Sequence, residues 1–410
     1  MPEDYPGDPV RYLLSAPAIR DRCLQLFELA GVDHLPHFRV NPSKMQGVAD
    51  YVVATMRRHY PDLDIPFHSR WRHLEVGGVD RWQHLDQELP PLSALDKARV
   101  KFDWVIPSVL LDAGAGAGWS YWDPLTQTRY ARSEGLAIAS FHLFKTGSFS
   151  SRPDFPWQTD GQGLQNLTLE QLAVGLQVSA ENPLVGLEGR WHLLQQLGKA
   201  LTNQPAFFGS APGRLGYLVD YLWQTGSPIS AQAVFDAVMA SLGTIWPGRL
   251  HWQGVNLGDA WFHSSLSGSQ PHHQWVPFHK LSQWLTYSLL EPLQALGASI
   301  TDLDALTGLP EYRNGGLFLD LGLLTLRDPT HVQQAHWVGS ELVVEWRALT
   351  VCLLDEVAQV IRQSLGLTSQ SLPLVKVLQG GTWLAGRQMA AQRRPGGIPP
   401  LQIISDGTVF

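Results

Sequence analysis

The sequence has little cysteine, no long apolar run and no excess of basic residues. Its two cysteines among 410 residues, Cys23 and Cys352, stand far apart. Two cysteines are too few for a disulfide framework and favour a reduced, intracellular compartment. No stretch of about 20 uninterrupted apolar residues occurs, so no membrane span is predicted. The beginning, MPEDYPGDPVRYLL, lacks the basic and apolar regions of a signal peptide. We therefore expect a cytoplasmic protein.

The charge balance argues against polyanionic partners. The net charge is −7 at pH 7, whereas phosphate backbones and acidic membrane surfaces are bound by basic patches. We expect neither a nucleic-acid nor a membrane partner, and the oligomeric state stays open. What the chain does contain is sixteen tryptophans. Most of them are expected in the core, and a few near carboxylates are suited to line a site for a flat ligand.

Apolar periodicity predicts a mostly α protein with a few short strands. Helices are predicted for the segments in which apolar residues recur every 3.6 residues, namely 11–30, 43–60, 92–111, 132–144, 169–178, 187–201, 215–223, 231–242, 278–296 and 341–365. Residues 68–91 and 146–166 are expected to be irregular, and 316–326 and 374–378 are strand candidates. No linker divides residues 1–410, so we predict one compact helical catalytic unit, with two lobes flanking a central pocket as the alternative.

The most informative segment is FDWVIPSVLLDAGAGAGWSYW, residues 102–122. Asp112 ends its apolar run, and three alternating glycines and the rings of Trp119, Tyr121 and Trp122 follow. One interpretation is the strand and glycine turn that cradle S-adenosylmethionine in Rossmann-type methyltransferases. Another is a buried helix that delivers Asp112 to the rim of a pocket roofed by the rings. A third is that the glycines only let a loop pack tightly. Helical patterning upstream disfavours the first.

Further blocks extend from about Pro9 to the end of the chain. They are RSEGLAIASFHLF, NPLVGLEGR, the WPGR loop, LGDAWFH, VPFHKLSQWLTYSLLEPL, LTGLPEYRNGGLFLD, SELVVEWRALTV, GGTWLAGR and the terminal SDGTVF. Together with the segment around Asp112 they resemble the uracil catabolism protein 4 family, also known as domain of unknown function 1688. The resemblance implies a role in degrading uracil after the ring has been attached to ribose and opened. It implies cleavage of the N-glycosidic bond of ribosylurea, or of its 5′-phosphate, with release of urea.

Three blocks are also similar to the queuosine-nucleotide salvage N-glycosylases, a helical family related in fold to helix-hairpin-helix DNA glycosylases. They are residues 102–112, the triplet Glu311, Tyr312 and Arg313, and the block from Glu345 through Arg347 to Val351. Position 311 is Glu where that family leads us to expect Asp, so the side chain is one methylene longer. This similarity implies a compact multi-helix fold and a substrate site that includes Tyr312, Arg313 and Glu345.

The implied reaction needs carboxylates. Cleavage of a ribosyl C–N bond passes through an oxocarbenium-like transition state, so the site must stabilise positive charge, activate water and assist the leaving group. We expect Glu311 to activate the water or stabilise the cation, and Asp112 to hold the nitrogenous leaving group or a ribose hydroxyl. The two roles are interchangeable at this point. The structural alternatives are a capping role for Asp112 and an ion pair with Arg313 for Glu311.

Other residues are candidates for contacts with the substrate. Trp119 and Trp122 are suited to cover the sugar or urea plane, with core packing the alternative for Trp122. Asp259 could bind ribose hydroxyls. A 5′-phosphate would need a cation, for which Lys280, at the start of a predicted helix, is preferred over the group of His142 and Lys145.

Asp259 and His263 are four residues apart and could share a helix face as metal ligands do. His272 and His273 follow closely, but no third ligand has a convincing spacing, so His263 is retained as a substrate contact. We therefore expect no metal and no cofactor. The alternatives to the N-glycosidase are an S-adenosylmethionine-dependent methyltransferase and a non-catalytic scaffold that binds a pathway intermediate.

Overall fold

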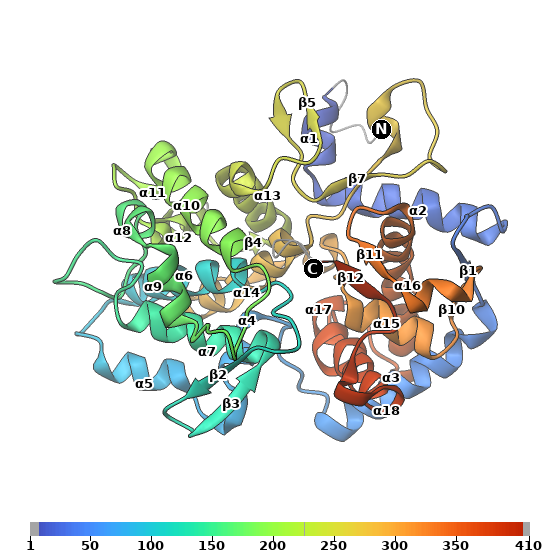
Figure 1. Cartoon of the computed structure of the whole chain (residues 1–410), viewed down its shortest axis with the longest axis horizontal. Coiled ribbons are helices and arrows are strands. Elements are labelled where there is room, and N and C mark those ends of the chain that lie inside the picture. Colours follow the sequence, from blue (N-terminus) through green and yellow to red (C-terminus); the bar gives the residue numbers. More distant parts are fainter. Residues whose placement is uncertain (1–7, 225, 405–410) are drawn as a thin grey trace. The chain divides into compact units, whose positions relative to one another are not determined.

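The computed structural model describes residues 8–224 and 226–404. Residues 1–7, Thr225 and the tail SDGTVF (405–410) lie outside the described residues. The chain divides into two compact units, each made mainly of helices (Figure 1). Unit 1 contains residues 8–68, 248–283 and 302–404, and unit 2 contains 69–224, 226–247 and 284–301. The mostly α fold class is confirmed, whereas a central pocket between two lobes stays a prediction.

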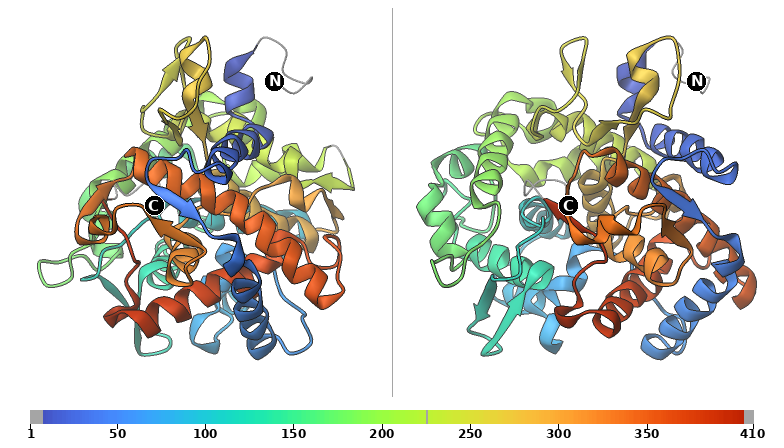
Figure 2. Two further views of the ribbon diagram at one scale, coloured as in Figure 1. Left: turned by 90° about the vertical axis from the view of Figure 1, so that its right-hand side faces the viewer. Right: turned by 45° about the vertical axis from the view of Figure 1, so that its right-hand side comes forward.

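Unit 1 is organised around its longest helix, α16 (Glu341–Leu365), which is buried along most of its length. α2 (Ala16–Gly31) and α3 (Met45–His59) pack against it, and the left view of Figure 2 shows the dark blue α2 beside the long orange α16. Apolar residues recur at helical spacing in all three, and packing buries these faces together. The side chain of Ser15 caps α2, and α16 ends at Gly366, whose φ of 67° is left-handed. Both are common helix boundaries.

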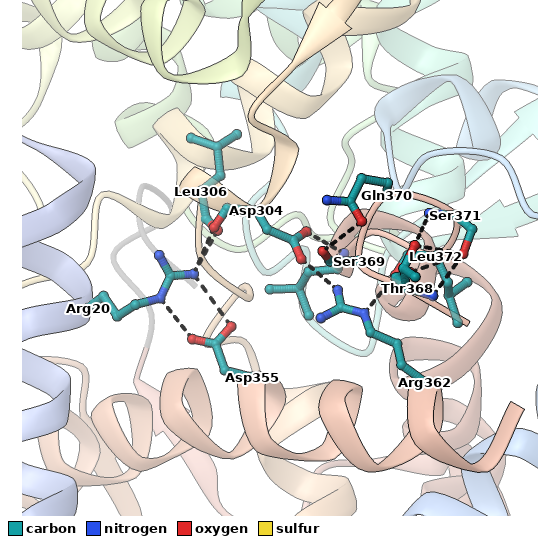
Figure 3. Close-up of polar contacts among 11 residues, drawn as sticks. Arg20, Asp304, Leu306, Asp355, Arg362, Thr368, Ser369, Gln370, Ser371 and Leu372 are labelled. Carbon is teal, nitrogen blue, oxygen red and sulfur yellow. Dashed lines mark hydrogen bonds and ion pairs between the residues drawn. The ribbon is translucent and has the colours of Figure 1, made fainter. Parts of the chain in front are cut away.

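Two arginines tie the helices of unit 1 to the segment that precedes α15. Arg20 of α2 donates from Nε to Oδ2 of Asp355 on α16 (2.9 Å) and from Nη2 to the carbonyl of Leu306 (3.0 Å) (Figure 3). Further along α16, Arg362 donates to Oδ2 of Asp304 (2.6 Å) (Figure 3). These side chains are partly exposed, so their ion pairs guide the path of the connecting segment and contribute only modestly to stability.

The strands of unit 1 pair two by two. The pairs are β1 (Phe38–Val40) with β10 (Leu324–Leu326), β5 (His251–Trp252) with β6 (Val255–Asn256), β7 (Ala260–Phe262) with β8 (Trp275–Pro277), and β11 (Ala335–Trp337) with β12 (Gln402–Ile404). The last pair is parallel and the others are antiparallel.

The two strand predictions are largely wrong. Residues 316–326 begin in α15 (Tyr312–Asp320) and contain a strand only in β10, and residues 374–378 contain α17 (Leu374–Val377). Glycine is a poor helix former, yet α15 contains Gly315 at a close approach to α16. A Cβ on Gly315 would lie 2.7 Å from Nε1 of Trp346. Tertiary packing therefore outweighs local propensity here.

Unit 2 has α6 (Ala94–Leu110) in its interior. Ser93 caps its beginning, and its second half is buried on all sides, which explains the unbroken apolar run before Asp112. α4 (Arg70–Leu74) and α7 (Arg132–Lys145) pack against α6, and the hairpin of β2 (Ser120–Asp123) and β3 (Thr128–Ala131) leads into α7. Unit 2 also contains α5 (Arg81–Glu88), α8 (Gly161–Asn166), α9 (Leu169–Gly175), α10 (Leu187–Asn203), α11 (Pro205–Phe208), α12 (Leu218–Trp223), α13 (Ala231–Leu242), most of α14 (Lys280–Ala295) and the parallel pair of β4 (Ile229–Ser230) and β9 (Ile300–Thr301).

Most helix predictions are confirmed, and those for α13 and α16 match residue for residue. The helix predicted for 11–30 is interrupted at Leu14 between α1 (Pro9–Leu13) and α2, and residues 68–91 contain α4 and α5 where irregular structure was expected. The methyltransferase interpretation requires a strand before the glycines. The structure has the helix α6 there, so this interpretation is wrong. Within the described ranges no helix is long and apolar enough to cross a membrane.

The contact between α15 and α18 (Trp383–Arg393) gives a first prediction. A Cβ on Gly386 of α18 would lie 2.1 Å from the carbonyl oxygen of Arg313. We expect Gly386→Ala to lower the free energy of unfolding by about 1–3 kcal/mol, because neither backbone can yield without moving its helix.

Gly47→Ala in α3 is the matched control in the same unit, since nothing lies within 4 Å of its Cβ position. It should raise stability by about 0.5–1 kcal/mol through helix propensity. Urea unfolding of both variants measures the difference, and similar effects at the two sites would contradict the packing argument.

Candidate active site

Asp112 lies just beyond the end of α6 and forms a buried ion pair. Its Oδ2 is 2.7 Å from Nη1 of Arg70 on α4. Arg70 is fully buried, whereas 9% of the Asp112 side chain remains exposed. A helix therefore does deliver this carboxylate, as the second interpretation of the sequence expected, and a fully buried guanidinium holds it.

Arg70 is in turn held by several groups of unit 2. Its Nε donates to Oγ of Ser108 (2.8 Å) and its Nη1 to the carbonyl of Ser133 (3.0 Å). Oγ of Ser108 also accepts a hydrogen bond from Ser140 (2.7 Å). Nη2 is buried and has no hydrogen-bond partner among the described residues. The guanidinium is thus fixed by α6 and α7 before it meets Asp112.

His73 completes this cluster. It lies one turn after Arg70 in α4, and its Nδ1 is 3.2 Å from Nη1 of Arg70 and 3.9 Å from Oδ2 of Asp112. The imidazole packs against the ring of Trp284, with centroids 5.6 Å apart. Only 8% of the His73 side chain is exposed, which is close to the value for Asp112. We call Arg70, His73 and Asp112 the Asp112 cluster.

A second buried guanidinium fixes the backbone of the loop that carries Asp112. Arg190 of α10 donates from Nε to the carbonyl of Leu111 (2.9 Å) and from Nη2 to the carbonyl of Ala113 (2.6 Å). Its Nη1 donates to the carbonyl of Val185. Burial lowers the pKa of Arg190 to about 10, so its charge persists at neutral pH. The carbonyls on either side of Asp112 are therefore held in place.

The glycines and rings after Asp112 pack tightly. Gly116 has a φ of 82°, and a Cβ there would lie 2.6 Å from Cγ2 of Val185. Trp119 is buried, and its indole N–H donates to the carbonyl of Leu176 (2.9 Å), so it is a core residue. Trp122 is 42% exposed, so core packing was the wrong alternative for it.

The cations expected to bind phosphate in unit 2 already have carboxylate partners. Nε2 of His142 lies 3.3 Å from Oδ1 of the buried Asp123, and burial lowers the pKa of this imidazole. Lys145 donates to Oε1 of Glu88 (2.6 Å). This group gives no support to a phosphate site.

Glu311 is the N-cap of α15 in unit 1. Its Oε2 accepts from the backbone N–H of Arg313 (2.6 Å) and its Oε1 from that of Asn314 (2.7 Å). Burial raises the pKa of Glu311, while these N–H donors and the charge of Lys280 act against the rise. Nη1 of Arg313 donates to the carbonyl of Gly397 (2.8 Å), and its guanidinium lies 5.0 Å from the ring centroid of Tyr312.

Asp259 is held by several donors of unit 1, and its expected role in binding ribose stays a prediction. Arg347 of α16 grips it with two hydrogen bonds of 2.8 and 2.7 Å. Oδ1 also accepts from Nε1 of Trp261 (2.6 Å), and Oδ2 from the backbone N–H of Lys280 (3.0 Å). Burial alone would raise the pKa of Asp259, but Arg347 and the N–H donors hold it well below its usual value.

The contact with Lys280 also bears on the predicted phosphate site. Lys280 is the first residue of α14 (Lys280–Ala295), and the carboxylate of Asp259 occupies its N–H group. The carboxylate of Asp259 therefore binds at the start of α14, at a backbone N–H group that was expected to bind a phosphate.

His263 and Glu345 form a second brace in unit 1. The segment between Asp259 and His263 is the strand β7, so the shared helix face expected for them is wrong. Nε2 of His263 lies 3.5 Å from Oε2 of Glu345, whose Oε1 accepts from the backbone N–H of Phe38 (2.6 Å). Both Glu345 and Arg347 are buried and brace the fold. Within the described residues no group of three or more His, Cys, Asp or Glu is placed to hold a metal ion.

The predicted residues thus fall into separate groups. Asp112 belongs to unit 2 and Glu311 to unit 1, and their convergence on one substrate stays a prediction. Sequence reasoning did not single out Arg70, His73 or Arg190. The available signals were the Arg-x-x-His spacing of residues 70–73 and the position of Arg190 at the end of the NPLVGLEGR block.

The protein is mostly helical and contains a candidate catalytic carboxylate, Asp112. Comparison with known proteins shows its family. The chain belongs to the family described as Protein of unknown function (DUF1688), whose model matches residues 12–410. It is 41% identical to Protein urg3 of Schizosaccharomyces pombe, over 98% of this chain and 99% of that protein. It is 38% identical to Uracil catabolism protein 4 of Lachancea kluyveri, over the same shares.

The Asp259–Arg347 pair gives a second prediction. Asp259→Asn leaves a buried guanidinium without its counter-charge and should destabilise the protein by about 3–5 kcal/mol at pH 7. Because folding depresses the pKa of Asp259, its contribution is present above its ordinary pKa of 3.8 and is lost as the pH falls below that value. The stability gap between wild type and variant should therefore narrow in acid.

Asp33→Asn is the control in the same unit. Asp33 also pairs with arginine, but its side chain is 60% exposed, so its loss should change stability little. Denaturant unfolding at neutral and acidic pH checks both variants. A gap for Asp259→Asn that stays constant with pH would contradict the ion-pair explanation.

Proposed function

We propose that this protein is an N-glycosidase of uracil catabolism. It hydrolyses the bond between ribose C1 and the urea nitrogen of ribosylurea, or of its 5′-phosphate, and releases urea and the sugar. Support comes from the resemblance on which the sequence assignment rests and from the relative named Uracil catabolism protein 4, 38% identical along almost its whole length. The reaction consumes one water and needs no cofactor.

The observation that carries the proposal is the anchoring of Asp112. An oxocarbenium-like transition state is stabilised best by a carboxylate that is fixed before the reaction begins. Arg70 fixes the side chain of Asp112, Arg190 fixes the carbonyls on either side, and a small part of the carboxylate remains exposed. A carboxylate that served only as a cap would not require two buried guanidinium groups.

Glu311 is the proposed second carboxylate. Burial raises its pKa, and a base works better as its pKa approaches the working pH. We therefore assign water activation to Glu311 and electrostatic or hydrogen-bonding contact with the substrate to Asp112. The N–H groups of Arg313 and Asn314 supply the orientation that a general base needs.

The third prediction tests the activity itself. Purified protein without added metal or S-adenosylmethionine should release urea from ribosylurea, measured together with the reducing sugar. Asp112→Asn should lower kcat by about 10²–10³ or more, because a prepositioned charge is lost. Binding of ribosylurea without turnover by the wild type would favour the scaffold alternative, and turnover that requires S-adenosylmethionine would favour the methyltransferase.

Asp103→Asn is the matched control, because Asp112→Asn also breaks a buried ion pair. Asp103 lies in α6, is fully buried and pairs with Arg214 at 2.8 Å. Both variants should lose stability, but only Asp112→Asn should lose kcat per folded molecule. Equal losses of kcat would show that destabilisation alone explains the effect.

The fourth prediction asks whether the two carboxylates serve one reaction. If they do, the double variant Asp112→Asn with Glu311→Gln should be little slower than the slower single variant, because residues that act as a unit are not additive. Glu311→Asp controls for the cap, since aspartate is a favoured N-cap residue. It should preserve the melting temperature of the protein while lowering kcat. Full additivity of the two losses would contradict a shared role.

A further inference from the structure

We infer that Asn314 is a further catalytic residue, whose side-chain oxygen holds the attacking water together with Glu311. The inference rests on the proposed function and deepens it, because it states how the first turn of α15 orients the nucleophile. The observation behind it is that Oδ1 of the fully buried Asn314 has no hydrogen-bond partner among the described residues. Buried carbonyl oxygens are normally hydrogen-bonded, so this one needs an explanation.

The other polar groups of Asn314 hold its side chain in place. Nδ2 donates to the carbonyl of Leu309 (3.0 Å), and the backbone N–H donates to Oε1 of Glu311 (2.7 Å). The contact with Leu309 also distinguishes the two ends of the amide, because a carbonyl oxygen only accepts and must face the N–H₂ group. Oδ1 is therefore an acceptor whose position is fixed and whose donor is missing from the described chain.

The local structure explains why Oδ1 lacks a donor within α15. Asn314 is the third residue after the N-cap Glu311, the position at which a Glu or Gln side chain accepts from the N-cap backbone N–H in a capping box. In this protein the backbone N–H of Glu311 donates to the carbonyl of Leu309 instead (2.9 Å). The donor that would usually serve this position is thus occupied by another acceptor.

Glu311 and Asn314 together offer two acceptors to one water. Each carboxylate oxygen of Glu311 accepts one backbone N–H and has a further lone pair, and 8% of the residue is exposed. A water has two hydrogens. Glu311 accepts the one that it removes, and Oδ1 of Asn314 accepts the other. With both hydrogens held, a lone pair of the water has a fixed direction for attack on ribose C1, which lowers the entropic part of the barrier.

The reaction then balances without a charge on Asn314. The water oxygen bonds to C1 as the C1–N bond breaks with its electron pair going to the urea nitrogen. Glu311 takes one proton from the water, and that proton ends on the urea nitrogen. The products are the sugar and urea, and Asn314 neither gains nor loses a proton.

Methanol tests this arrangement, because it has one hydroxyl hydrogen where water has two. In a mixed solvent, attack by water on ribosylurea gives ribose and attack by methanol gives methyl riboside, while urea is released in both cases. Methanol can bind to Glu311 or to Asn314 but cannot donate to both, so the wild type should favour water. Asn314→Leu keeps roughly the shape of the side chain and removes its acceptor. Asn314→Asp keeps an oxygen acceptor and loses the donor to Leu309.

We expect Asn314→Leu to lower kcat for urea release by about 10–10², the cost of a misplaced reactant. It should also raise the ratio of methyl riboside to ribose by about 5–10-fold, the discrimination that one hydrogen bond supplies. Asn314→Asp should keep a ratio close to that of the wild type even if its kcat falls. The ratio does not depend on how much of a variant is folded. A wild type that forms methyl riboside in proportion to the methanol present would overturn the inference without any variant.

Gln283→Leu is the matched control. Gln283 is a fully buried amide of the same unit, but its Oε1 accepts from the backbone N–H of Thr307 (2.8 Å) and its Nε2 donates to Oγ1 of that residue (2.8 Å). Its replacement should lower stability and leave the product ratio unchanged.

The remaining outcomes separate the inference from the proposed function. If the wild type releases urea but Asn314→Leu keeps its product ratio, or Gln283→Leu shifts the ratio equally, Asn314 does not hold the water and the proposed function stands. If the wild type releases no urea from ribosylurea, the proposed function fails and the inference fails with it.

Discussion

The structure around the candidate active site depends on the ion pair between Arg70 and Asp112. A guanidinium removed from water is costly, and hydrogen bonds and an opposite charge must offset that cost. For Arg70 that compensation comes from Ser108 on α6, the carbonyl of Ser133 on α7 and Asp112 itself. Three helices of unit 2 are thereby held around one charge. The position of Asp112 is consequently a property of the packed unit, and His73 inherits its orientation from the same guanidinium.

The same solution recurs at other buried charges of the protein. Arg190 satisfies backbone carbonyls of the loop after α6, and Arg347 grips Asp259 in unit 1. In these cases arginine supplies several directed donors from one planar group, which lysine cannot do. The pair of Arg20 and Asp355 differs from these buried charges, because both of its side chains are partly exposed and Arg20 also contacts a connecting segment. The buried arginines therefore fix groups in the interior of each unit, whereas the partly exposed pair joins a helix to a connecting segment.

Sequence reasoning recovered the helices whose apolar period and caps agree, such as α13 and α16, and it recognised Asp112 because the residue ends an unbroken apolar run. It failed where long-range packing decides the outcome. Local propensity gave no indication that Gly315 would be accommodated in a helix against Trp346. Asp259 and His263 have a spacing that suits a helix, but the pairing of β7 with β8 makes the segment a strand. Arg70 and His73 lie next to Asp112 in the structure but about forty residues from it in the chain. A local sequence pattern cannot predict a contact over that separation.

Glu345 and Arg347 have a consequence for how α16 is seated. The two residues are of opposite charge and are separated by two positions, so they leave the helix in very different directions. Each has a partner in unit 1: Glu345 lies 3.5 Å from the buried His263, and Arg347 pairs with Asp259, whose side chain is only 12% exposed. An entirely apolar helix could turn about its own axis or slide by one turn at modest cost. In α16 either displacement would separate both charged side chains from their partners and leave them unpaired in the interior. Glu345 and Arg347 therefore fix the rotation of this helix about its axis and its position along the axis.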